Sequence, residues 1–378
     1  MLEIYTPGHN YLTDTLIMWG IVRIVQECCD QEKSKVIGQG GRYRILLEAF
    51  DEERFANVFK TALGEIINIA QVSDLLKSGK KISLGKALIS ERLQIGLDKD
   101  TRNGIVRVAS NFLHDTPQLG VFTVDHVDKM MEGRLGRGDL YNLYIPLSGI
   151  YGKYLTGEYQ YVDKPYKVCD HCILFSMLGF DSMMGFARKG GERIYSLLGF
   201  EGEAKISELS HLLNQLWYIQ GETLLSKALR AKASLTRLAQ VFIMYLMMPQ
   251  ATRSQLPRIG WYMIIFSYDI GRTKRVSGFQ IVDLVPIRNL IGKIEEEYSY
   301  LPRLVELLLE GASIDKGGDE VINLLAELSL NRNLYEAFRV LRALRVVVDR
   351  IDDKKRVKRD LLNIIDSSLA DGLINAIS

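Results

Sequence analysis

Apolar residues in the first part of the chain change between helical and strand-like spacing. The apolar run over 16–25 is long enough for a helix, and Thr13 and Asp14 are candidate caps at its start. A glycine-rich turn at 38–44 leads into a strand expected over 43–47. Residues 51–78 form a further expected helix, with apolar positions at Phe55, Val58, Phe59, Ala62, Ile66, Ile69 and Ala70. Periodicity fades over 132–157, where glycines predict a long loop region or short strands.

The second half of the chain is predicted to be mainly helical. Helical periodicity covers 207–218 and 222–248, and from 287 onward we expect helices only, broken at Gly311 and at 315–318. The exception is an apolar, aromatic run at 261–268, which has strand length and a candidate hairpin partner at 277–284.

These patterns predict an α+β fold. Residues 1–200 are expected to form a mixed α/β region with glycine- and tyrosine-rich loops and a central cysteine pair. Residues 201–378 are expected to form a mainly helical region with an inserted strand hairpin near 261–284.

Composition places the chain among folded proteins of the cell interior. Its 378 residues are 47% hydrophobic, which is ordinary for a globular protein and too high for a disordered one. The start shows no secretion signal, and the most apolar stretch, 241–248, is far shorter than the roughly 20 residues of a membrane span. Four unevenly placed cysteines do not form a disulfide framework. We therefore expect a cytoplasmic protein without membrane contact.

Charge is distributed unevenly although the chain carries only +2 overall. Residues 225–275 contain nine basic residues and one acid, Asp269, so this stretch is a basic island. Such segregation favours a polyanionic partner, most commonly nucleic acid. Near the end of the chain, 295–330 has nine acids against two bases, whereas 331–360 has ten bases against five acids. An acidic segment beside a basic one suggests subunit contacts as much as nucleic acid.

The basic island supplies two candidate nucleic-acid surfaces. If 222–248 is one helix, Lys227, Arg230, Ser234 and Arg237 fall on one face as a basic ridge beside an apolar stripe. Arg272, Lys274 and Arg275 would form a basic tip on the predicted hairpin. Phosphate contacts of this kind position a nucleic-acid backbone without reading its sequence. A solvated helix face and an ordinary charged turn are the alternatives.

Two further segments offer nucleic-acid contacts. The stretch 141–166 holds seven of the 18 tyrosines, and Tyr151 and Tyr154 are candidates for stacking on bases, with Arg134 and Arg137 nearby. Tyrosines at the margin of a core are the alternative. The glycine-rich turn could wrap a phosphate with help from Arg42 and Arg44, although it lacks the Walker A ending. A flexible turn is the alternative there.

Cysteine and histidine give two hypotheses for metal binding. Cys169 and Cys172 have the spacing of half a zinc site, and buried cysteines without metal are the alternative; no cofactor is otherwise required. His171 lies between them and is expected to point away. A metal-dependent nuclease or phosphohydrolase is the enzymatic alternative, and its candidate residues are His114, Asp115, His126 and Asp128.

Several segments together resemble the archaeal CRISPR-associated large subunit of the Csa type, from the subtype I-A interference complex (Cascade). The resemblance is carried by Ile4–Leu12, by Asp14–Gly20, by the tyrosine-rich stretch leading into Cys169–Phe180, and by the basic helical second half. A central cysteine pair, often a degenerate zinc finger, is similar to what this family shows.

The resemblance implies a role in antiviral defence without catalysis. Such a subunit would sit near the 5′ handle of the crRNA, help recognise the motif flanking the target DNA, and help open the duplex. Its partners would be crRNA, target DNA, other subunits of the complex, and a helicase and nuclease. A structural assembly protein without nucleic-acid contact is the remaining alternative.

Overall fold

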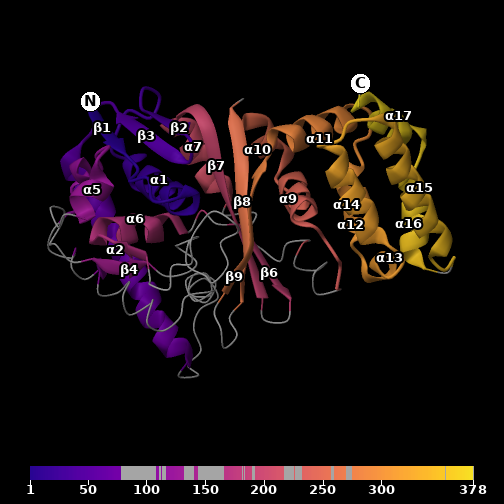
Figure 1. The fold of residues 1–378 in the computed structure, drawn as a ribbon, viewed down its shortest axis with the longest axis horizontal. Coiled ribbons are helices and arrows are strands. Elements are labelled where there is room, and N and C mark those ends of the chain that lie inside the picture. Colours follow the sequence, from indigo (N-terminus) through magenta and orange to yellow (C-terminus); the bar gives the residue numbers. More distant parts are fainter. Residues whose placement is uncertain are drawn as a thin grey trace.

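A computed structural model describes the chain over residues 1–77, 108–109, 112, 116–131, 140–143, 166–180, 182, 184–189, 192–216, 225, 232–256, 259–269, 275–353 and 355–377. It confirms the α+β class. A central antiparallel sheet separates N-terminal helices at one end of the molecule from a C-terminal group of helices at the other (Figure 1).

The sheet has the strand order β1-β3-β2-β7-β8-β9, and every pairing in it is antiparallel. Its strands are β1 (Leu2–Tyr5), β2 (Lys35–Gln39), β3 (Arg42–Leu47), β7 (Glu192–Lys205), β8 (Gly260–Asp269) and β9 (Arg275–Asp283). β6 (Met184–Lys189) also pairs with β7. The predicted hairpin is confirmed as β8 and β9, in which Tyr262 lies opposite Asp283 and Asp269 opposite Arg275.

β7 joins the two halves of the chain. It pairs with β2 through its last residues and with β8 along most of its length. The strand therefore runs through position 200, where the sequence predicts a boundary between two regions, and the sheet combines strands from both sides of it.

α1 (Tyr11–Val25) is buried over almost its whole length. The side chain of Asn10 accepts a hydrogen bond from the amide of Thr13 and caps the helix. Thr13 and Asp14, the predicted caps, therefore lie inside the first turn, and that prediction is wrong. The Asp14 carboxylate instead accepts hydrogen bonds from the amides of Gly8, at 2.6 Å, and Asn10, at 2.9 Å, so it fixes the loop before the helix.

α6 (Asp170–Phe180) crosses α1 with the two backbones in contact. A Cβ atom on Gly20 would lie 2.0 Å from the Phe175 carbonyl oxygen, and one on Gly179 would lie 1.8 Å from the Leu16 carbonyl oxygen. Only glycine permits this approach. The Trp19 indole donates to the carbonyl of Leu198 on β7, at 2.7 Å, and so fixes α1 against the sheet.

The other N-terminal elements are α2 (Glu52–Lys77), the 3₁₀ turn η1 (Leu119–Val121), α5 (His126–Met131), β4 (Tyr141–Leu143), β5 (Tyr166–Val168) and α7 (Ile206–Leu216). α2 and α7 confirm the helices predicted there. β4 pairs with β5 and confirms a short strand within 132–157. The remainder of that segment lies outside the described residues, apart from residue 140.

The C-terminal elements confirm the prediction of helices from 287 onward. They are α9 (Arg237–Leu246), α10 (Gln250–Gln255), α11 (Val285–Glu297), α12 (Leu301–Leu308), α13 (Gly311–Ile314), α14 (Gly318–Leu328), α15 (Leu334–Arg350), α16 (Arg356–Ile364) and α17 (Ser367–Asn375). α9 packs against β8, β9, α11 and α14, so it connects the sheet to this group. Within the described part of the chain, none of the helices has the length and apolarity needed to cross a membrane.

The single helix predicted over 222–248 is wrong in its middle. Residues 233–236 have no regular secondary structure, and α9 begins only at Arg237, capped by Thr236. The cause is a contact with α14. Asn323 accepts from the amide of Thr236 and donates to the carbonyl of Ser234, both at 2.9 Å, and Asp319 accepts from the amide of Ser234, at 2.6 Å. These hydrogen bonds hold the segment extended.

Candidate metal centre and charged surfaces

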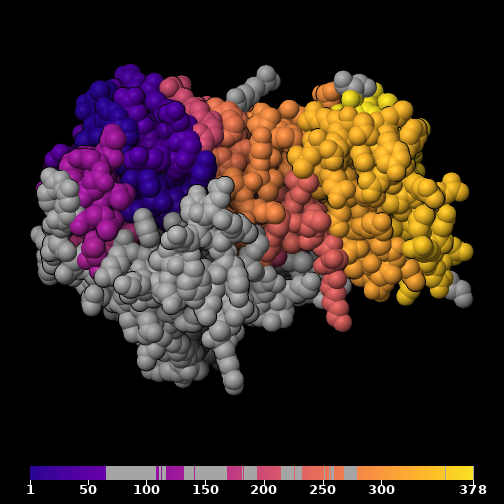
Figure 2. Space-filling model, in the orientation of Figure 1, coloured from indigo at the N-terminus to yellow at the C-terminus, as the bar shows by residue number. Residues whose placement is uncertain are grey.

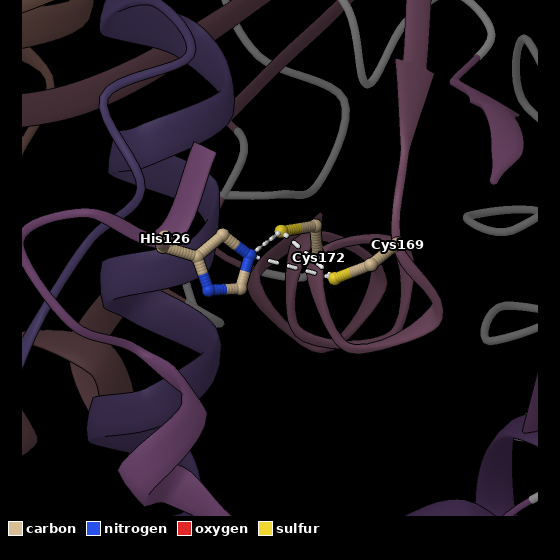
Figure 3. A group of neighbouring side chains, drawn as sticks. All are labelled: His126, Cys169 and Cys172. Atoms are coloured by element: carbon tan, nitrogen blue, oxygen red, sulfur yellow. Dashed lines mark hydrogen bonds between the residues drawn. The ribbon is translucent and has the colours of Figure 1, made fainter. Parts of the chain in front are cut away.

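Four buried side chains from three distant segments meet beside the crossing of α1 and α6. Cys169 and Cys172 stand at the start of α6, His126 opens α5, and His9 lies in the loop before α1. The Cys172 Sγ atom lies 3.2 Å from Nε2 of His9 and 3.2 Å from Nε2 of His126. The Cys169 Sγ atom lies 3.5 Å from Nε2 of His126 and 3.5 Å from the Cys172 Sγ atom. The imidazole of His126 points at both sulfurs (Figure 3).

His126 is oriented by its own backbone neighbourhood. Its Nδ1 atom lies 2.7 Å from the carbonyl oxygen of Val121. Because a carbonyl only accepts hydrogen bonds, Nδ1 carries the proton and the Nε2 lone pair faces the sulfurs. Phe122 stacks on the ring, with the centroids 5.2 Å apart. The side chain is therefore held in the tautomer and orientation of a metal ligand.

Arg42 ties the segment of His9 to the segment of His126. Its Nη2 atom donates to the carbonyls of Thr6, Pro7 and Val124, at 3.4, 3.2 and 3.1 Å. The first two precede His9 and the third precedes His126. Together with Asp14, which holds the amides on either side of His9, this arginine positions two of the four side chains.

Burial and close contacts shift the pKa values of the side chains in the cluster in different directions. Burial, and then the neighbouring His126, lower the pKa of His9 to about 3, so its imidazole is neutral. Hydrogen bonding with Cys172 and the two adjacent histidines holds the pKa of Cys169 well below its usual range, against the effect of burial. Burial, and then the proximity of Cys169, hold the pKa of Cys172 well above it. Two thiols this close in a dry site cannot both ionise without a cation.

His171 does not belong to the same set of ligands. Its Nδ1 atom bonds the Asp170 carboxylate at 2.8 Å. Burial lowers the pKa of His171, but the bonds to Asp170 and Cys169 outweigh burial and raise that pKa to about 9. Of the two groups of described residues that are close enough to share an ion, the one formed by His126, Cys169 and Cys172 is the better site, because it offers two sulfurs and an imidazole nitrogen, whereas Nδ1 of His171 is bonded to Asp170.

The sequence identified the cysteines of this cluster but not its histidines. Cys169 and Cys172 share one helical turn, whereas His9 and His126 are 163 and 46 residues away from Cys172 along the chain. The alternative hypothesis of a metal-dependent hydrolase grouped His126 with Asp128, but His126 is buried and turned toward the sulfurs while Asp128 is exposed on the same helix. His114 and Asp115, the other residues of that hypothesis, lie outside the described residues.

The glycine-rich turn makes contacts within the chain. The amides of Gly40 and Gly41 donate to the carboxylate of Glu201, at 2.9 and 3.3 Å, in the place where a phosphate was predicted. Nε of Arg44 donates to Glu3 at 2.6 Å, and its guanidinium lies over the ring of Tyr5.

Two arginines in the described part of the basic island, Arg237 and Arg253, make contacts within the chain, whereas Lys232 is exposed. Arg237 donates to Gln240 and Ser267, and Arg253 forms a two-pronged ion pair with Glu295 on α11. Arg275 begins β9. The other predicted nucleic-acid contacts lie outside the described residues; they are Lys227, Arg230, Arg272, Lys274, Arg134, Arg137, Tyr151 and Tyr154.

An exposed basic and aromatic surface lies on α15 instead. Tyr335, Phe338, Arg342 and Arg345 follow one another at spacings of three and four residues, which places them on one face of the helix; we call them the α15 stripe. Tyr335 is 71% exposed, Phe338 is 55% exposed, and the side chain of Arg345 is 82% exposed. The opposite face packs into the core through Ala337, Val340, Leu344 and Val347.

α16 extends this surface with Lys355 in front of it and with Arg356 and Arg359 on it, all three exposed. Both helices stand at the end of the molecule farthest from α5 and α6, and this C-terminal part (yellow) forms an outer surface in Figure 2.

Comparison with known proteins gives two matches. The profile of a family described as "CRISPR-associated protein (Cas_Csa4)" matches residues 2–369 of the chain. A protein of Thermoproteus tenax named "CRISPR system associated protein Cas8" is 28% identical over 193 residues, which are 47% of this chain and 50% of that protein. The match thus spans about half the length of that curated relative.

Proposed function

The chain belongs to the Csa4 family of CRISPR-associated proteins, as its resemblance to Csa-type subunits predicted, and we propose that it is a non-catalytic large subunit that binds nucleic acid in an RNA-guided interference complex. Its ligands would be crRNA and target DNA, and its neighbours the other subunits of the complex and a helicase and nuclease. The observation that carries the proposal is the α15 stripe, which offers cations and aromatic rings together on an exposed face.

Arg345 on α15 and Arg356 on α16 can bind phosphates because the ion pairs that they form within their own helices contribute little free energy. Arg345 pairs with Asp349 at 3.5 Å and Arg356 with Asp360 at 3.4 Å, each within one helix, and both arginines are more than four-fifths exposed. Exposed pairs of this kind contribute about 0–1 kcal/mol, so a phosphate can replace the carboxylate at little cost. Arg253, by contrast, is 9% exposed in its pair with Glu295.

The aromatic residues of the stripe favour a single strand. Exposed rings stack on unpaired bases at about 1–3 kcal/mol per base, while the arginines neutralise the adjoining phosphates. Residues 335 to 345 extend over about 15 Å of helix, enough for a few nucleotides. The face would contact guide RNA or a DNA strand displaced from the duplex. Lys227, Arg230, Arg272 and Lys274, which lie outside the described residues, remain predicted contacts in addition to the stripe.

The test is a fluorescence-anisotropy titration with single-stranded RNA, single-stranded DNA and duplex DNA at two salt concentrations. We expect salt-sensitive binding, and the variant Tyr335→Ala/Phe338→Ala should weaken binding of single strands by at least about fivefold. Tyr300→Ala removes another exposed ring, outside the stripe, and is the matched control. Unchanged single-strand affinity in the double variant would refute this surface, and absence of binding by the intact protein at low salt would refute the function.

A protein-docking surface is the second candidate, because Leu330 and Leu334 are 58% and 50% exposed beside Tyr335 and Phe338. Together these side chains form an apolar patch next to the arginines, which is typical of a contact with another subunit. In that case the double variant would lose association with a neighbouring subunit and keep its affinity for nucleic acid.

A further inference from the structure

The buried cluster at the start of α6 has the composition of a closed zinc site, and three of its four residues also have the spacing. We propose that His9, His126, Cys169 and Cys172 together bind one structural zinc ion, which fastens the loop before α1 and the start of α5 to the start of α6. Four protein ligands leave no open position, so the site would be structural and not catalytic.

The distances within the cluster suit this assignment. Zinc bonds of about 2.0–2.3 Å give a tetrahedron with edges of about 3.3–3.8 Å. The four measured separations among the sulfurs and the Nε2 atoms are 3.2, 3.2, 3.5 and 3.5 Å. The ring centroids of the two histidines are 6.4 Å apart, and His9 contacts the cluster through the Cys172 Sγ atom. The ligand atoms of His126, Cys169 and Cys172 all lie within 4.8 Å of one another, whereas His9 stands outside that group and has to move inward to complete the set.

Charge balance gives a second argument. Two thiolates and two neutral imidazoles around Zn²⁺ form a neutral unit, whereas unpaired charge in a dry core is costly. All four side chains are at most 9% exposed. A nucleophilic cysteine would need access for a substrate, which this burial denies. A disulfide would need sulfurs about 2.05 Å apart, and they lie 3.5 Å apart as free thiols.

The surroundings of the cluster supply a third argument. The Val121 carbonyl fixes the tautomer of His126, which is the usual role of a group behind a zinc ligand. Arg42 joins the two histidine segments through three carbonyls, and Asp14 holds the loop of His9. These contacts shape the site before metal arrives.

The experiment measures metal directly and involves no nucleic acid, so its outcome is independent of the proposed function. The full-length protein, purified without chelator, should contain about one zinc ion per chain by elemental mass spectrometry. Exchange with Co²⁺ should give the visible bands of tetrahedral cobalt together with a thiolate-to-cobalt charge-transfer band. Zinc content close to zero, with no tetrahedral cobalt spectrum, would overturn the proposal. So would a Cys169–Cys172 disulfide in the protein purified under reducing conditions.

Variants identify the ligands. Cys172→Ser leaves only the Cys169 thiolate, so it should reduce the charge-transfer band to about half and lower zinc occupancy, and His9→Gln should shift the cobalt spectrum and lower zinc occupancy well below half. Cys28→Ser removes a buried thiol outside the cluster and should leave both unchanged. An unchanged cobalt spectrum in His9→Gln would exclude His9 as a ligand. If Cys28→Ser lost as much zinc and as much of the charge-transfer band as Cys172→Ser, the zinc site at the start of α6 would be excluded.

Arg42 is expected to act as a positioning residue for the same ion. Arg42→Gln should weaken zinc affinity about tenfold, because the two histidine segments lose their common donor, whereas Arg44→Gln on the same strand should not. Equal affinities in the two variants would contradict the role of Arg42.

Discussion

Arg253 forms a nearly buried ion pair with Glu295 and is therefore a structural residue. Both of its terminal nitrogens bond the carboxylate of Glu295, at 2.9 and 2.8 Å, and the side chain is almost enclosed. Arg253→Met should lower the free energy of unfolding by about 3 kcal/mol, because Glu295 is left charged and without its partner. Arg253→Met/Glu295→Leu should recover much of the loss. Urea denaturation measures both, and a fully stable single variant would show that the ion pair contributes nothing.

Gly179 permits the contact between α1 and α6, beside which the cluster of His9, His126, Cys169 and Cys172 lies. Gly179→Ala should cost about 1–3 kcal/mol or more, because the added Cβ meets a backbone carbonyl that cannot move away alone. Gly292→Ala, on an open part of α11, is the control and should stabilise by about 0.5–1 kcal/mol. Thermal denaturation of the two variants compares them. Equal stabilities of the Gly179→Ala and Gly292→Ala variants would mean that α1 and α6 can move apart at this crossing without a cost in free energy.

Residue-level prediction from the sequence depends on how far apart the partners lie in the chain. Cys169 and Cys172 could be paired because they are one helical turn apart. His9 and His126 could not be added to them, because only the packing of α1 on α6 and the tie through Arg42 bring them there. The same holds for Arg253, which counts as a free cation until α11 supplies Glu295.

Elements whose signal is local were predicted well. The β8–β9 hairpin and α2 carry their alternation or periodicity within their own residues. The helix over 222–248 failed at 233–236, where periodicity continues but α14 supplies stronger partners for the backbone. Such tertiary hydrogen bonds cannot be predicted from the sequence of the segment whose conformation they change.

Asn323 tests that explanation at the level of the element. Asn323→Ala removes an acceptor from the amide of Thr236 and a donor from the carbonyl of Ser234, so we expect a loss of about 1–2 kcal/mol and faster hydrogen exchange of the Thr236 amide. Exchange monitored by NMR should show the effect at the start of α9 and little change in β7. Unchanged exchange at Thr236 would mean that the α14 contact does not hold the segment.

Across the whole molecule, the overall charge of +2 conceals an acidic and a basic segment that follow each other in the C-terminal helices. α15 packs directly on α14, so the acidic and the basic segment adjoin in the fold. Exposed arginines of the basic segment lie on α15 and α16. The division into two regions at residue 200 stays a prediction, and a cut there would sever β7.

The most direct test of the account is the salt dependence of nucleic-acid binding in Arg342→Gln/Arg345→Gln. Each phosphate contact contributes about 0.7 to the slope of log K against log salt on a single strand and about 0.9 on a duplex. We predict that the double variant lowers the slope by about 1.4–1.8 relative to the intact protein, similarly for every sequence. Lys33→Gln/Lys205→Gln removes two exposed cations outside the stripe, one just before β2 and one at the end of β7, and should leave the slope unchanged. An unchanged slope in the arginine variant, or an equal fall in the lysine control, would contradict binding through the α15 stripe.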